Sequence, residues 1–172
     1  MDIFKKFYGG IYGKFFNQKL IVDIYSDFER KRLALDREEV FTHKILVAWQ
    51  TKIFTIGTEE FYQLKDFIYY GDDNDVASVG FSLYGRGVII KEKLNFFIRA
   101  DKYFPDLRIS ATTYRRWEFF YLAGLDYTPN KNLHIIPNIW NNLYYTGNPT
   151  WTDGKRKGND LVARVTIHYI FK

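Results

Sequence analysis

Residues 161–172 place the strongest constraint on how this chain can fold. Apolar side chains fill one parity of the stretch, namely Leu161, Ala163, Val165, Ile167, Tyr169 and Phe171. The other parity carries Arg164, Thr166 and His168. Because successive side chains of a strand point to opposite faces, this period of two predicts a β-strand over 161–171 with one apolar face. A final strand leaves an edge that must be covered, and a closed barrel covers it best.

The same alternation continues through nearly the whole chain. Further strands are predicted over 3–16, 19–28, 40–50, 53–63, 76–90, 94–102, 117–128 and 133–145. Short connections at 51–52, 91–93 and 129–132 alternate with long polar ones at 29–39, 64–75, 103–116 and 146–159. We therefore predict one all-β domain over 1–172, an antiparallel up-and-down transmembrane β-barrel of about 8–10 strands, or the C-terminal part of one.

The composition is compatible with a membrane barrel and excludes a helical membrane protein. Aromatic residues make up 20% of the chain, yet the mean hydropathy is −0.31 and charged residues make up 26%. No run approaches the roughly 20 apolar residues that a spanning helix needs. A barrel strand keeps a polar average because half of its side chains face a wet lumen.

Catalysis, cofactors and nucleic acid have little support in the sequence. The net charge is +5, but the Lys and Arg residues are scattered, so no nucleic-acid partner is predicted. The chain has no Cys, and its histidines His43, His134 and His168 lie outside any triad spacing. We predict that the protein is not an enzyme and holds no cofactor and no metal ion.

Several segments resemble bacterial outer-membrane porins, a family with phosphate-selective-porin-like and uncharacterised members. Segment 94–106 has the pattern aromatic-x-Arg-x-Asp, at Phe97, Arg99 and Asp101, followed by a Pro-Asp loop. Segment 123–138 contains the similar turn Gly-Leu-Asp-Tyr-Thr-Pro, and 56–59 is similar to the family's x-Gly-x-Glu strand. The alternating end with its aromatic Phe171 resembles the closing strand of such barrels.

The resemblance implies a passive diffusion channel for small hydrophilic solutes or anions in the bacterial outer membrane. Short turns would lie at the periplasmic rim and long loops outside, and the C-terminal strand would engage the barrel-assembly machinery. Pore-lining candidates on the inner parity are Arg86, Arg99, Asp101, Glu118, Asp126, His134, Arg164 and His168. They would serve as a structural ion-pair ladder, as selectivity residues, or as both. Candidates for the aromatic belt that contacts membrane lipid are Tyr127, Tyr145, Tyr169 and Phe171.

The first residues, the strand count and the inner parity leave alternatives to a complete, open pore. Residues 1–10 lack the features of a signal peptide, and about nine strands is an odd count where bacterial single-chain barrels have even counts, so we expect the C-terminal part of a longer barrel. Phe97, Phe120, Leu122 and Trp140 fall on the inner parity, which suits a narrow or a plugged lumen. The alternatives are a soluble lipocalin-like barrel that binds an apolar ligand and a non-conducting structural or adhesin-like outer-membrane barrel.

Overall fold

The chain forms one antiparallel sheet. A computed structural model describes residues 5–32, 37–69, 72–107, 115–147 and 155–171. Its strands are β1 (Lys5–Phe15), β2 (Leu20–Arg32), β3 (Arg37–Gln50), β4 (Phe54–Tyr69), β5 (Asp72–Ile90), β6 (Leu94–Phe104), β7 (Arg115–Asn130), β8 (Leu133–Gly147) and β9 (Lys155–Tyr169). Each strand pairs with the next in the order β1 to β9, which confirms the all-β, up-and-down prediction. The described ranges contain no helix long and apolar enough to cross a membrane.

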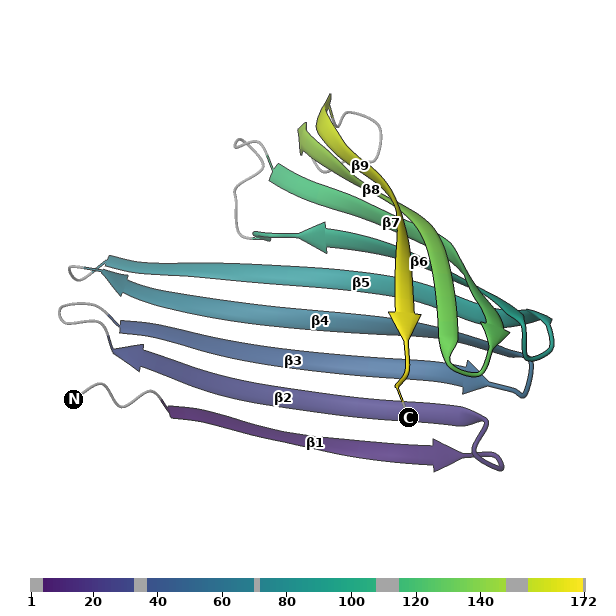
Figure 1. Ribbon diagram of the computed structural model, residues 1–172. Coiled ribbons are helices and arrows are strands. Elements are labelled where there is room, and N and C mark those ends of the chain that lie inside the picture. Colours follow the sequence, from purple (N-terminus) through teal and green to yellow (C-terminus); the bar gives the residue numbers. More distant parts are fainter. Residues whose placement is uncertain (1–4, 33–36, 70–71, 108–114, 148–154, 172) are drawn as a thin grey trace.

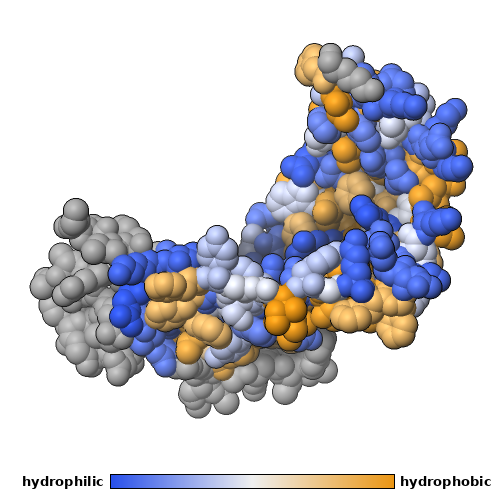
Figure 2. Space-filling view, turned by 90° about the horizontal axis from the view of Figure 1, so that it is seen from below, coloured by the Kyte–Doolittle hydropathy of each residue, from blue (hydrophilic) through white to orange (hydrophobic). Residues whose placement is uncertain are grey.

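The sheet is curved but open. Figure 1 shows the sheet curling so that β9 lies in front of other strands in that view, and Figure 2 shows the bent profile of the sheet from below. Among the described residues no pairing joins β9 to β1. Both edge strands therefore keep one side with unpaired backbone groups.

The two faces of the sheet differ in polarity and in exposure. We call the side with Arg99 and Asp101 the polar face, and the side with Ile98 and Ile139 the apolar face. In β7, the apolar-face residues at 121, 123, 125 and 127 are exposed, whereas the residues between them are half-buried. Side chains converge on the inside of a curved sheet and diverge on the outside. The polar face is therefore the concave one.

Within the described ranges, no second layer packs against the sheet. Among the described residues, the buried hydrophobic side chains are limited to Val40, Ala48 and Ala77, and no large side chain is fully buried. By contrast, Leu161 is 60% exposed and Ile139 is 47% exposed, and many other large apolar residues share that state. Monomeric soluble proteins rarely leave so much contiguous apolar surface uncovered.

Two of the predicted long connections were wrong. Strands β2 and β3 run on to Arg32 and from Arg37, through most of the predicted loop at 29–39, and β4 and β5 likewise take up most of 64–75. Polar side chains continue the ladder there, as in the 2.7 Å ion pair between Arg30 Nε and Glu39 Oε1 across β2 and β3. Because polar residues fill both parities at 29–32, 37–39, 65–66 and 72–75, the sequence pattern looked like a loop there.

The later connections are closer to the prediction, although β9 begins at Lys155, earlier than the sequence suggested. Residues 108–114 and 148–154 lie outside the described part.

Glycines beneath aromatic rings let the concave face close up. Gly80 of β5 pairs with Phe61 on one side and Tyr103 on the other, and these two rings stack over it with centroids 5.8 Å apart. Gly124 of β7 pairs with Phe97, and a Cβ added there would lie 2.9 Å from Phe97 Cε1. Aromatic residues cover cross-strand glycines in this way in twisted sheets.

Candidate functional site

The concave polar face is the candidate functional surface. The structure places all eight predicted pore-lining residues on it, in strands β5 to β9: Arg86, Arg99, Asp101, Glu118, Asp126, His134, Arg164 and His168. They do not converge on one point. Instead they form separate small networks along the face, because each network follows its own cross-strand register.

The first network links β5 and β6. Arg99 Nε donates to both carboxylate oxygens of Asp101, at 2.8 and 2.9 Å, and its Nη2 donates to Ser82 Oγ at 3.1 Å. Arg99 and Asp101 are two residues apart on one strand, so they share a face. The pair lies within β6, whereas a ladder would join neighbouring strands, so the ion-pair ladder stays a prediction. Because the pair is partly exposed, with side chains 45% and 23% accessible, it adds at most about 1 kcal/mol of stability.

The second network lies near the turn between β7 and β8. His134 Nδ1 is 2.9 Å from Asp126 Oδ1 and 3.3 Å from Thr128 Oγ1. His168 lies directly opposite His134 in the register of β8 and β9, with ring centroids 5.9 Å apart. Asp126 and Thr128 both approach the same ring nitrogen. The His134 ring therefore has a second nitrogen, Nε2, that neither of them contacts.

Arg164 and Glu118 bind amides rather than opposite charges. Arg164 Nε donates to Asn138 Oδ1 at 3.0 Å, and the Asn138 amide donates to the carbonyl of Ile136 at 3.1 Å. Asn138 is buried at 9% exposure, so these bonds fix its orientation. Asn142 Nδ2 is 3.4 Å from Glu118 Oε2. Arg164 and Glu118 are thus each linked to an amide side chain of the neighbouring strand β8.

Polar residues of β1 to β4 extend the same face, and the sequence analysis missed them. Lys44 Nζ lies 3.1 Å from Glu59 Oε2, across β3 and β4. Lys6 Nζ lies 3.5 Å from Asp27 Oδ2, and Asp27 is only 7% exposed. The available signal was opposite charge at matching parity on neighbouring strands, which becomes readable only once the register is known.

Arg86 lines a depression on the polar face close to the short turns. The depression has a volume of about 530 Å³, and its walls include Gln50, Thr55, Asn95, Phe97 and Asp126. Within the described part of the chain, Arg86 makes no ion pair or hydrogen bond. Its guanidinium is therefore available to a solute that enters the concave side.

The apolar face carries an aromatic cluster at the end of the sheet where the long connections lie. Trp117 stacks on Tyr145 with centroids 3.7 Å apart and planes at 3°. Lys102 Nζ lies 5.2 Å from the centre of the Trp117 ring and 4.9 Å from that of Phe104. Aromatic rings with a nearby Lys are typical of a membrane–water interface.

Aromatic residues also mark the opposite end of the apolar face. Tyr127 and Tyr169 lie close to the short turns, and both are exposed. Phe171 follows the end of β9 and packs edge-on against Tyr169 at 4.8 Å. Trp49 occupies the equivalent end of β3. The four predicted belt residues thus lie at strand ends, with Tyr145 at one end and the other three at the opposite end.

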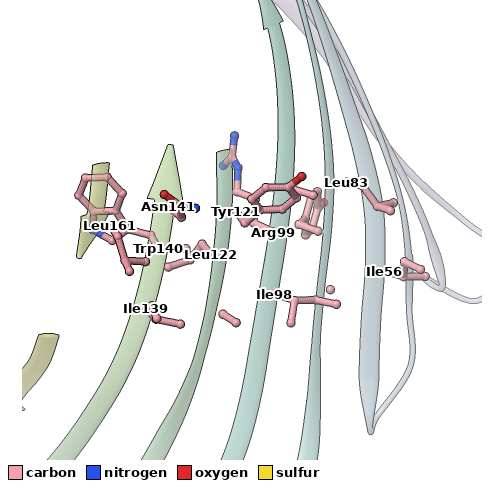
Figure 3. Close-up of a pocket in the computed structure, with 14 residues that line it drawn as sticks. Ile56, Leu83, Ile98, Arg99, Tyr121, Leu122, Ile139, Trp140, Asn141 and Leu161 are labelled. Carbon is pink, nitrogen blue, oxygen red and sulfur yellow. The ribbon is translucent and has the colours of Figure 1, made fainter. Parts of the chain in front are cut away.

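Between these clusters the apolar face has a shallow aliphatic hollow of about 430 Å³, shown in Figure 3. Ile98, Ile139 and Leu161 line it, together with the small residues Gly85, Ala100 and Ala123. In Figure 3 the Arg99 side chain points away from Ile98, toward the other face of β6. The hollow therefore belongs to the convex surface and is separate from the polar networks.

Comparisons with known proteins leave the family open. No protein-family model, curated protein or solved structure matches the chain. In the part that the structure describes, no group of three or more His, Asp or Glu side chains is placed to hold a metal ion. Function is therefore inferred from the geometry of the two faces of the sheet.

Proposed function

We propose that this sheet forms part of the wall of a bacterial outer-membrane β-barrel that acts as a porin-like channel for small hydrophilic solutes or ions. The observation that carries the proposal is a single-layer sheet with an exposed apolar convex face and no core among the described residues. Covering a Leu, Ile or Phe side chain contributes roughly 1.5–3 kcal/mol, so the stability of the sheet depends on what covers this face. Lipid acyl chains would cover all of it at once.

The distribution of side chains on the apolar face supports a bilayer as the covering phase. Trp117 and Tyr145 gather at one end of the strands, and Trp49, Tyr127 and Tyr169 at the other. The aliphatic hollow lies between them. A transmembrane barrel has the same order, with an apolar band of about 25 Å flanked by aromatic girdles at both interfaces.

The stagger of the strands supports a tilted barrel wall. One row of register partners crosses the whole sheet: Phe15, Leu20, Trp49, Ile56, Gly85, Ile98, Ala123, Ile139 and Ala163. The row starts at the last residue of β1 but reaches β9 well before its end at Tyr169. Closing a sheet into a barrel requires such a stagger, because the strands must tilt against the barrel axis.

Closure of the proposed barrel has a topological requirement. Strands β1 and β9 run in the same direction, because neighbours alternate along a nine-stranded antiparallel sheet. A wall in which all neighbours are antiparallel would need an odd number of further strands between these two edges. Direct pairing of β9 with β1 would instead be parallel.

On the proposed wall the polar networks would line the lumen. Arg86, without an ion pair among the described residues, would attract anions, whereas Asp101 and Glu118 would attract cations. The soluble lipocalin-like alternative is less favoured because a carrier of apolar ligands needs an apolar inner lining. Here the concave face carries the charged networks beside Phe97, Leu122 and Trp140, and the convex face is the more apolar one.

Quenching of single tryptophans by brominated lipids tests the proposed orientation. Three variants each retain one of Trp49, Trp117 and Trp140, with the other tryptophans, including Trp151, replaced by Phe. We expect bromines near the headgroups to quench Trp49 and Trp117 strongly and Trp140, on the polar face, only weakly. Equal quenching of all three, or quenching of Trp140 alone, would show that the assigned faces are wrong.

Conductance of the assembled protein in planar bilayers tests the channel. Stepwise currents carried by small ions are the expected result. A barrel that passes the quenching test but carries no current would exclude the channel and leave the non-conducting structural or adhesin-like barrel. A chain that stays soluble without detergent and shows no lipid quenching would favour the soluble alternative.

A further inference from the structure

The two histidines on the polar face form a cross-strand pair with one ring already oriented. His134 and His168 are direct register partners on β8 and β9, near the turn at Lys131 and Asn132. Their rings are 5.9 Å apart, at an angle of 29°. His134 is half-buried, whereas His168 is exposed and makes no hydrogen bond within the described part of the chain.

Asp126 fixes which nitrogen of His134 is available. A carboxylate that accepts from Nδ1, at 2.9 Å, selects the tautomer with the proton on Nδ1. The lone pair then lies on Nε2, which Asp126 and Thr128 leave uncontacted. A histidine that donates one ring nitrogen to a carboxylate and offers the other is the usual arrangement of a metal-ligating histidine.

We propose that His134 and His168 form a chelating site for a divalent transition-metal ion, with Asp126 as the positioning residue. Imidazole suits Cu²⁺, Ni²⁺ and Zn²⁺, and among divalent ions Cu²⁺ binds such nitrogen sites most strongly. Metal–nitrogen distances of about 2.0–2.1 Å require the two rings to converge. The exposed His168 ring can rotate to do so, because no hydrogen bond within the described residues holds it.

The site has two protein ligands, so solvent or a solute fills the other coordination positions. The described residues contain no group of three or more His, Asp or Glu side chains that could hold a metal ion, so the proposed site is limited to these two imidazoles. The site also does not depend on whether the barrel conducts. A folded protein that fails the conductance test would still bind the ion, so the two proposals fail separately.

Titration of the folded full chain with Cu²⁺ tests the site. The titration uses protein without an affinity tag. Binding of Cu²⁺ is followed by calorimetry and by electron paramagnetic resonance, which reports nitrogen ligands. The matched control is His43→Asn, which removes the third histidine of the chain, on the apolar face, where it is 2.7 Å from Ser26 Oγ. Far-UV circular dichroism checks that each variant retains its strand content.

We expect one Cu²⁺ per chain, with two nitrogen ligands in the resonance spectrum. His134→Asn and His168→Asn should each weaken binding about tenfold or more, because each leaves a single imidazole. Asp126→Asn should weaken binding about 10- to 100-fold while keeping both ligands. His43→Asn should bind as the parent does. The site is excluded if folded His168→Asn binds Cu²⁺ as tightly as the parent, or if His43→Asn weakens binding as much as His134→Asn.

Discussion

Replacing Gly80 by Ala tests whether aromatic rings over glycines hold the concave face together. A Cβ at Gly80 would lie 2.7 Å from Phe61 Cδ1 and closer still to the neighbouring ring carbon Cε1. Carbon atoms in contact prefer separations of about 3.5–4.0 Å, so the Phe61 ring must move by roughly 1 Å. It cannot simply slide sideways, because it stacks with Tyr103 on the far side of β5.

The size of the effect follows from three terms. Forcing a ring about 30° from its rotamer costs about 0.5–1.5 kcal/mol, and the disturbed stack loses a similar amount. Replacing Gly by Ala within a strand returns about 0.5–1 kcal/mol by reducing the freedom of the unfolded chain. The free energy of unfolding of Gly80→Ala should therefore fall by about 1 kcal/mol, within a range of about 0–2.5 kcal/mol.

Gly9→Ala is the matched control. A Cβ at Gly9 of β1 would meet no heavy atom within 4 Å, so only the favourable term applies. We expect this variant to be more stable than the parent by up to about 1 kcal/mol. The measurement is reversible urea unfolding in detergent micelles, followed by tryptophan fluorescence, with equal slopes required before midpoints are compared.

A double-mutant cycle with Phe61→Ala isolates the steric cause. Without the ring, the Gly80→Ala penalty should disappear and the sign should match that of Gly9→Ala. The expected coupling energy between the two positions is about 1–3 kcal/mol, the sum of the ring and stacking terms, because the favourable Gly→Ala term is present in both backgrounds and cancels. If Gly80→Ala costs the same with and without the Phe61 ring, the proposed packing of ring over glycine is wrong.

Three further substitutions test the two faces. Val165→Arg on the apolar face should lower the free energy of unfolding in vesicles by about 2–4 kcal/mol if residue 165 lies near the bilayer centre. The control Thr166→Arg, on the polar face, should have little effect. Equal costs for the two variants would contradict the assignment of the apolar face to lipid. Trp117→Ala should lose about 1 kcal/mol through the Tyr145 stack, measured by urea unfolding. Its total cost should be smaller by that amount in a Tyr145→Ala background, where the contacts with Lys102 and Phe119 remain. Asp101→Asn should change the free energy of unfolding by less than about 1 kcal/mol. It should also shift the reversal potential in the direction of anion selectivity. An unchanged reversal potential would show that Asp101 does not act on the permeating ions.

The faces could be predicted from the sequence, but the strand ends could not. Alternation placed Arg164 and His168 opposite Val165 because a period of two needs no knowledge of neighbouring strands. At 29–39 the pattern fails, since Arg30 and Glu39 are polar and yet pair across β2 and β3 at 2.7 Å. Cross-strand ion pairs of this kind make strand residues resemble a loop when the chain is considered alone.

The polar networks depend on register, which a single sequence does not supply. His134 faces His168 only because the pairing of β8 with β9 brings those two positions opposite each other. A slip by one residue would send His168 to the apolar face and break the pair. The contact of His134 with Asp126 needs a second register, between β7 and β8, so two alignments must be right before the cluster is visible.

The absence of a second layer among the described residues best distinguishes a membrane wall from a soluble sandwich. The alternation of apolar and polar residues along the sequence could not reveal it. The same period of two fits a soluble sandwich, whose apolar faces pack together, and a membrane wall, whose apolar face meets lipid. In the described part of the sheet the apolar face is not packed in the first way, because Leu161 and Ile139 remain exposed on the convex side and no described layer covers them. The covering phase must therefore come from outside the described chain. The aromatic rings near the ends of β3, β7, β8 and β9, with mainly aliphatic residues between them, favour a bilayer over another protein, since a protein partner would not require that order on several neighbouring strands.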